Sequence, residues 1–170
     1  MGHKQRVALA VALQLLILAG IAGARQWTLT TGTMILLETA PLDPRDLFRG
    51  DYVVLSYRIS TLDPHTLGAV ETFRQGETVY VGLEQRGEFW EAVSVGSSRP
   101  SRLFLRGDVR SVWPDGIRIG VKYGIESYFV PEGLGRRIEM RRDPLKVEVA
   151  VGRDGTGVIR RVFIGDHPLP

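Results

Sequence analysis

The chain has 170 residues, no cysteine and a formal net charge of +3. This length suits one ordinary domain plus a small additional segment. The lack of cysteine excludes disulfides, thiolate metal sites and cysteine nucleophiles. Residues 1–25 carry three basic side chains and no acid, so the remainder is balanced, with 22 − 3 = 19 basic against 19 acidic residues. A nucleic-acid-binding domain concentrates Lys and Arg on one face, and the balance therefore argues against a nucleic-acid partner.

Residues 7–24 form an apolar segment in which only Gln14 is polar. As a helix this segment would extend about 27 Å, close to the thickness of the hydrocarbon core of a bilayer. Trp27 follows at a position suited to the membrane interface, and Lys4 and Arg6 precede the segment. The positive-inside rule then predicts a cytoplasmic N-terminus over residues 1–6, a signal-anchor helix over residues 7–26 and an extracytoplasmic domain over residues 27–170.

The main alternative for this segment is a cleaved signal peptide. Ala22-Gly23-Ala24 is an acceptable cleavage site, but the apolar stretch is longer than the usual core of about 7–15 residues. A buried helix of a soluble core would need a polar face, which Gln14 alone cannot supply. We therefore expect an uncleaved membrane anchor, with cleavage after Ala24 left open.

Beyond Trp27 the pattern changes to the alternation that is typical of β-strands. In residues 52–59 the expected core face is formed by Val53, Leu55, Tyr57 and Ile59. We expect a loop over residues 61–76 with one helical turn near 69–73, and a short helix over residues 133–142. Turns are expected at residues 43–46, 86–87, 115–116 and 154–155. Further strands are expected over residues 28–38, 77–85, 88–95, 102–113, 116–123, 128–130, 145–152 and 157–164. Such short strands with closely spaced turns predict a mainly β domain, either a β-sandwich or a partly open β-barrel.

One run carries a recognisable signature. Residues 50–57 read Gly50-Asp51-Tyr52-x-x-Leu55-x-Tyr57. All five fixed positions agree with the signature of the GDYXXLXY family of small membrane-anchored bacterial proteins, which the chain therefore resembles.

A second run, residues 123–133, reads YGIESYFVPEG and is similar to a Tyr-Phe-Val-Pro-Glu-Gly run of the same family. The resemblance extends over essentially the full length. It implies a membrane anchor in the bacterial envelope and neighbouring multi-spanning membrane proteins, but no settled biochemical activity.

The signature run has two interpretations. In the structural one, Gly50 and Asp51 form a turn that leads into a core strand, and a buried tyrosine hydroxyl needs a partner. In the functional one, five charged residues within nine positions hold a partner or ligand. Glu132 likewise has two interpretations. It either lies at the start of a short helix, where its negative charge interacts favourably with the exposed backbone amides, or acts together with Glu126 in a site. The candidate interaction residues are Asp43, Arg45, Asp46, Arg49, Gly50, Asp51, Tyr52, Leu55, Tyr57, Glu126, Tyr128, Pro131, Glu132 and Gly133.

Enzymatic interpretations find little support in the residues. A membrane-anchored β-domain with a Gly-Asp motif at the start of a strand is loosely similar to signal peptidase I, which needs a serine nucleophile shortly before that motif and a lysine base. No serine occurs before Ser56, so Lys122 would have nothing to activate. No paired histidine spacing or glycine-rich phosphate loop occurs either. We expect no enzymatic activity, no metal and no cofactor.

The sequence thus favours an accessory or interaction domain that works beside a multi-spanning integral membrane protein. The alternative is a domain that binds a small ligand or a cell-wall glycan, with Tyr52, Tyr57, Tyr128 and nearby acids lining a pocket. A signal-peptidase-like hydrolase is the third possibility.

Overall fold

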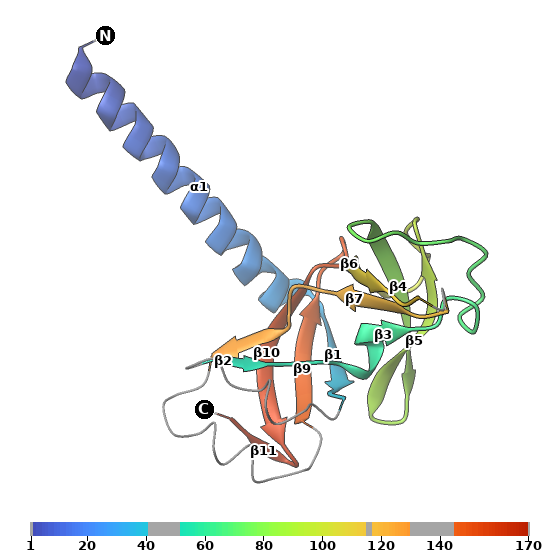
Figure 1. Ribbon diagram of the computed structural model, residues 1–170. Coiled ribbons are helices and arrows are strands. Elements are labelled where there is room, and N and C mark those ends of the chain that lie inside the picture. Colours follow the sequence, from blue (N-terminus) through green and yellow to red (C-terminus); the bar gives the residue numbers. More distant parts are fainter. Residues whose placement is uncertain (1, 41–51, 115–116, 130–144, 170) are drawn as a thin grey trace.

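A computed structural model describes residues 2–40, 52–114, 117–129 and 145–169. It consists of a long N-terminal helix, α1 (His3–Thr31), that projects from a β-domain (Figure 1). The helix is longer than the predicted span, and it includes residues 28–31, which were predicted as strand. The prediction was wrong there because threonine also fits a helix when its hydroxyl bonds a carbonyl one turn earlier. Thr28 donates to Ala24 O at 3.2 Å, and Thr31 donates to Trp27 O at 2.8 Å.

Helix α1 is apolar around its whole circumference. Of the described residues, only Lys4–Thr31 form a helix long and apolar enough to cross a membrane, and none of its apolar window is buried against the rest of the chain. A helix that is apolar on all sides is buried, either in a protein core or in a bilayer. Because the β-domain leaves this helix uncovered, α1 is a candidate membrane span.

Within the described residues, the β-domain contains three antiparallel sheets. The first is the four-stranded sheet β1 (Thr33–Glu38), β9 (Leu145–Val151), β10 (Gly157–Ile164) and β11 (His167–Pro168), in that order. The second is the curved, nearly closed five-stranded sheet β3 (Thr61–Leu62), β7 (Ile119–Lys122), β6 (Phe104–Val112), β4 (Thr78–Arg86) and β5 (Phe89–Gly96). The third is the two-stranded ribbon of β2 (Tyr52–Val54) and β8 (Ser127–Phe129). The prediction of a mainly β domain is therefore confirmed, and of its two alternatives, β-sandwich and partly open β-barrel, the nearly closed five-stranded sheet resembles the barrel.

One continuous hydrophobic core joins the sheets. Alternate residues of β1, such as Ile35 and Leu37, are buried, and β1 also packs against β5 of the other sheet. Strand β1, which follows α1 directly, pairs along its length with β9, from Thr33 opposite Val151 to Glu38 opposite Lys146. The first strand of the domain is thus fixed by one of the last, and α1 is attached to the interior of the fold.

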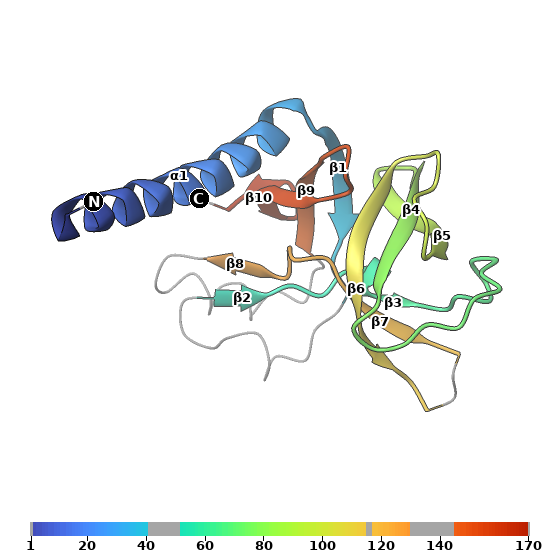
Figure 2. The same ribbon diagram turned by 90° about the horizontal axis from the view of Figure 1, so that it is seen from above.

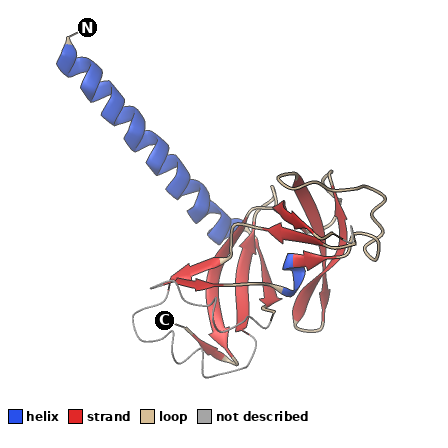
Figure 3. Cartoon of the chain, in the orientation of Figure 1, coloured by secondary structure: helices blue, strands red, loops and turns tan. Residues whose placement is uncertain are grey.

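The structure differs from the prediction after the signature. Strand β2 ends at Val54, and the chain turns through a short 3₁₀ helix, η1 (Arg58–Ser60), which is the small blue segment of the domain in Figure 3. Leu55, Tyr57 and Ile59 are nevertheless buried, as the alternation predicted. The prediction of a helical turn near residues 69–73 was wrong, because these residues form an irregular loop.

The predicted β4–β5 and β9–β10 hairpins are confirmed, with Gly87 at φ 65° and Gly155 at φ 81° in their turns. A positive φ favours glycine, because glycine has no Cβ that would clash with the backbone. The predicted turns at residues 43–46 and 115–116 and the predicted helix at 133–142 lie outside the described residues.

Candidate functional site

The two runs that the sequence singled out lie side by side. Strand β2, which begins within the first run, pairs with β8 of the second, with Tyr52 opposite Phe129 and Val54 opposite Ser127. The Leu55 amide extends this pairing by donating to Glu126 O at 2.7 Å. Both views of the fold show the β2–β8 ribbon on the side of the domain from which α1 projects (Figures 1 and 2).

Two buried tyrosines join the runs at the base of this ribbon. The Tyr57 hydroxyl donates to the carbonyl of Ile125 at 2.5 Å, and the Tyr123 hydroxyl donates to the carbonyl of Ile59 at 2.6 Å. We call Tyr57 and Tyr123 the tyrosine pair. Burial raises the pKa of both phenols well above its ordinary value, and the negative charge of Glu126 adds to the effect. The pair thus consists of neutral hydrogen-bond donors that hold two distant segments together.

Glu126 organises the turn between β7 and β8. Its carboxylate accepts hydrogen bonds from the backbone amides of Tyr123, at 2.5 Å, and Gly124, at 2.9 Å. Gly124 has φ 82°, in the left-handed region that favours glycine. The carboxylate is therefore engaged by its own chain, and it fixes the turn that delivers Tyr123 to its partner.

The other candidate residues from the sequence are placed only in part. Leu55 and Tyr57 are buried, with exposed fractions of 2% and 1%, and Tyr128 is half-buried. Tyr57 accordingly packs inside the domain and does not line a ligand pocket. The remaining candidates, other than Tyr52 and Glu126, lie outside the described residues: Asp43, Arg45, Asp46, Arg49, Gly50, Asp51, Pro131, Glu132 and Gly133. The charged cluster and the proposed pairing of Glu126 with Glu132 stay predictions.

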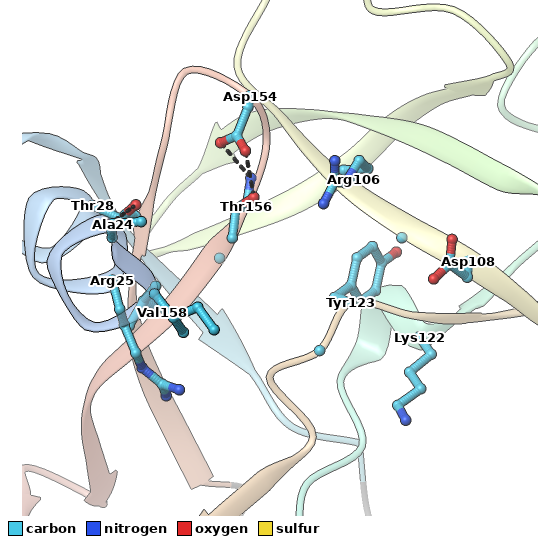
Figure 4. Close-up of a pocket in the computed structure, with 14 residues that line it drawn as sticks. Ala24, Arg25, Thr28, Arg106, Asp108, Lys122, Tyr123, Asp154, Thr156 and Val158 are labelled. Atoms are coloured by element: carbon cyan, nitrogen blue, oxygen red, sulfur yellow. Dashed lines mark hydrogen bonds between the residues drawn. The ribbon is translucent and has the colours of Figure 1, made fainter. Parts of the chain in front are cut away.

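The structure also contains a pocket that sequence reasoning missed. A cavity of about 650 Å³ lies between the last turns of α1 and the β-domain (Figure 4). Arg25 lines it from the helix, and Arg106, Lys122 and Tyr123 line it from the domain. The helix residues of its wall are spaced at 21, 24, 25 and 28, which is one helical face, but only the tertiary structure shows what that face meets.

A second, smaller cavity of about 310 Å³ lies near β5 and η1. Phe89 and Trp90 contribute aromatic surface, and Asp63 contributes a carboxylate. Arg58 and Glu38, which also line it, form an ion pair at 2.6 Å. In the part of the chain that the structure describes, no group of three His, Asp or Glu side chains is arranged to hold a metal ion.

Comparison with known proteins identifies the family. The family model described as "GDYXXLXY protein" matches residues 14–162, which include most of α1, the tyrosine pair and the β2–β8 ribbon. Curated proteins give no significant match to this chain. Solved structures give none either. Since the family match covers most of the chain, the protein belongs to the GDYXXLXY family.

Proposed function

We propose that this protein is a membrane-anchored accessory subunit whose β-domain lies against the bilayer and binds an integral membrane protein. In this proposal α1 is an uncleaved span of the bacterial inner membrane, with residues 1–6 in the cytoplasm and the β-domain on the periplasmic side. The positive charges at Lys4 and Arg6, before the apolar segment, support this orientation. No catalytic step is assigned to the protein.

The observation that carries the proposal is the absence of a linker between α1 and the domain. The helix ends at Thr31 and β1 begins at Thr33, so Gly32 alone separates them. The Gly32 amide donates to Thr28 O at 2.9 Å, and a Cβ at this position would lie 2.9 Å from the Val151 carbonyl oxygen. The junction is therefore packed against β9, and α1 also contacts β9 and β10.

A junction of this kind restricts the reach of the domain. Flexible linkers allow a tethered domain to search a large volume, whereas a helix that continues into a packed strand holds the domain at one height and orientation. A domain held in this way meets partners that are in the same membrane. This supports an integral membrane partner over a soluble one.

The charged residues at and before the start of the signature are the candidate contact. Strand β2 begins at Tyr52 in the ribbon that shares a side of the domain with α1 (Figure 2). The charged residues Arg45, Arg49 and Asp51 precede it in the chain. We assign the partner contact to these charges, so their removal should weaken association while leaving the domain folded.

Crosslinking in native membranes tests the proposal. The full-length protein should yield one integral membrane partner, and Asp51→Ala should lose it. Inserting about ten Gly and Ser residues after Gly32, which adds roughly 17 Å of flexible reach, should also reduce the crosslink. The same insertion after Gly68, which lies in an exposed turn, is the matched control and should keep the crosslink. The loop between β3 and β4 that contains this turn lies on the side of the domain away from α1 (Figure 1). An unchanged crosslink after the Gly32 insertion, or no specific partner with a folded domain, would contradict the proposal.

A ligand-binding function is the second candidate, and the smaller cavity favours it. Its aromatic residues, Phe89 and Trp90, beside a few polar groups resemble the lining of a small-molecule site. This function predicts that a cell-wall glycan fragment raises the melting temperature of the full-length protein in detergent. Trp90→Ala should abolish the shift, and a broad set of fragments without any shift would argue against the function.

A further inference from the structure

One face of α1 changes character where the apolar segment ends. Ile21, Ala24, Arg25 and Thr28 all line the larger cavity. Their spacing of three, four and seven residues places them on the same side of the helix. Along this face the surface passes from apolar, at Ile21 and Ala24, to cationic at Arg25. In a membrane-spanning helix this change falls at the boundary between the hydrocarbon and the headgroups.

The opposite wall of the cavity adds two more cations. Arg106 lies on β6 and Lys122 on β7, and both are exposed. Figure 4 shows Arg25 and Lys122 on opposite sides of the cavity, with Arg106 above Tyr123 between them. Three cationic side chains from three elements thus surround one space at the membrane end of the domain.

The two acids of the cavity already have hydrogen-bond partners. Asp108 accepts from the Thr78 hydroxyl at 3.0 Å. Asp154 accepts from the Thr156 hydroxyl at 2.6 Å and from the Thr156 amide at 3.1 Å. The hydroxyl bond is the main reason that the pKa of Asp154 is lowered, and the nearby Arg106 adds a smaller effect. Both carboxylates are therefore held as part of the wall.

The cations, in contrast, have unused hydrogen-bonding capacity. Within residues 2–40, 52–114, 117–129 and 145–169, the side chains of Arg25, Arg106 and Lys122 form no ion pair within 4.0 Å and no hydrogen bond. The formal charge of the lining is 3 − 2 = +1. A guanidinium presents several donors in a geometry that suits phosphate oxygens, and an ammonium adds a strong point charge.

We propose that this cavity binds the phosphate of a phospholipid headgroup from the leaflet on the domain's side of the membrane. Arg25, Arg106 and Lys122 donate to the phosphate oxygens. Ile21 and Ala24 lie on the membrane side of the same cavity, where they contact the glycerol and the first acyl carbons. This apolar wall is the reason to assign a lipid rather than a soluble phosphate. The inference rests on the membrane anchor of the proposed function but not on the protein partner.

Native mass spectrometry of the full-length protein in detergent tests the proposal with three probes. Phosphatidylglycerol carries both phosphate and acyl chains, diacylglycerol lacks the phosphate, and glycerol 3-phosphate lacks the chains. We expect one phosphatidylglycerol adduct with at least tenfold higher affinity than either of the other probes. The double variant Arg25→Gln/Lys122→Gln should lose about tenfold or more of this affinity, because two charge-assisted contacts are removed.

Arg110→Gln is the matched control. Arg110 is an exposed arginine on β6, four residues from Arg106, and it does not line the cavity. The Arg110→Gln protein should bind phosphatidylglycerol as tightly as the unsubstituted protein does. The melting temperatures of Arg110→Gln and of the double variant should confirm that both are folded. Equal affinity for diacylglycerol, or a folded double variant that binds undiminished, would overturn the proposal. Equal affinity for glycerol 3-phosphate would overturn the lipid assignment. A double variant that loses lipid while it keeps the protein crosslink would separate this site from the partner contact.

Discussion

Tyr57 and Tyr123 are related by a reciprocal exchange of hydrogen bonds. Each hydroxyl donates to the carbonyl two residues beyond the other tyrosine, Tyr57 to Ile125 and Tyr123 to Ile59. Tyr57 is the last fixed residue of the signature, so the signature ends in a bond to the second run that the sequence singled out. This relationship favours a structural role for Tyr57 and leaves the charged residues before Tyr52 as candidates for binding.

Removing either hydroxyl should destabilise the domain. Tyr57→Phe and Tyr123→Phe should each lower the free energy of unfolding by about 1–3 kcal/mol, because a buried carbonyl loses its donor. The double variant should show non-additive loss, since both bonds join the same two segments. Urea unfolding of the full-length protein in detergent measures this. Tyr80→Phe is the control, as Tyr80 is half-buried and its hydroxyl has no hydrogen bond within the described ranges. Losses below about 0.5 kcal/mol for both tyrosines of the pair would contradict the assignment.

The tyrosine pair also predicts a specific alkaline response. Burial raises the pKa of both phenols above the ordinary 10.0. The folded state therefore holds these protons more tightly than the unfolded state, so the associated stability is complete below about pH 10 and is lost as the pH rises further. In an ultraviolet titration, the phenols of Tyr57 and Tyr123 should ionise only as the protein unfolds. The Tyr57→Phe/Tyr123→Phe variant should lack this delayed step. Ionisation of both of these phenols while the fold stays intact would refute the prediction.

Glu126 should matter for stability through the turn that it caps. Glu126→Ala removes the acceptor for the amides of Tyr123 and Gly124 and should cost about 1–3 kcal/mol. Glu126→Gln keeps one acceptor oxygen and should cost less, while Glu84→Gln, an exposed site on β4, should cost little. Thermal and urea unfolding measure the difference. If Glu126→Ala leaves stability unchanged but abolishes the partner crosslink, Glu126 belongs to the interaction surface instead.

Asp154 should contribute to the acid dependence of stability. The hydrogen bond from Thr156 lowers its pKa below the ordinary 3.8. Its contribution is therefore present above that value and is lost as the pH falls through the lower folded value. The size is small, below about 1 kcal/mol, because Asp154 is exposed and solvent screens it. The free energy of unfolding should fall less between about pH 6 and pH 3 for Thr156→Val, which lacks the hydroxyl, than for Thr156→Ser, which keeps it. Identical pH profiles for the two variants would show that this bond does not shift the carboxylate.

The strands could be predicted well from the sequence, because the alternation of apolar and polar residues along a strand follows its buried and exposed faces. Leu55, Tyr57 and Ile59 are buried as their spacing indicated, although β2 itself ends at Val54. The end of α1 was harder, because threonine favours strands in isolation but here continues a helix that is already formed. Whether such threonines are helix or strand can be predicted from their residue type only once it is known that a helix precedes them.

Two features depended on contacts that a single sequence does not reveal. Burial of Tyr57 implied that its hydroxyl has a partner, but that partner lies 68 residues away in the chain. The larger cavity combines a helical face near residue 25 with strand residues beyond residue 105. Only the antiparallel arrangement of β6, β7, β9 and β10 around the end of α1 brings these cations together.

The distance of the β-domain from the bilayer distinguishes a domain held against the membrane from one that moves freely. The chain has no cysteine, so a single label can be introduced by one substitution. Arg153→Cys places the label in the β9–β10 turn, whose Gly152 lies close to Thr28 near the end of α1. Val70→Cys places it in the loop between β3 and β4, which lies at the far end of the domain (Figure 2), and Val70 is 98% exposed. In nanodiscs with quencher-labelled headgroups, a fluorophore at residue 153 should be quenched several-fold more than one at residue 70. Inserting the Gly and Ser linker after Gly32 should remove most of that difference. Equal quenching at both positions in the protein without the insertion would show that the domain moves freely, and would contradict a β-domain held against the membrane.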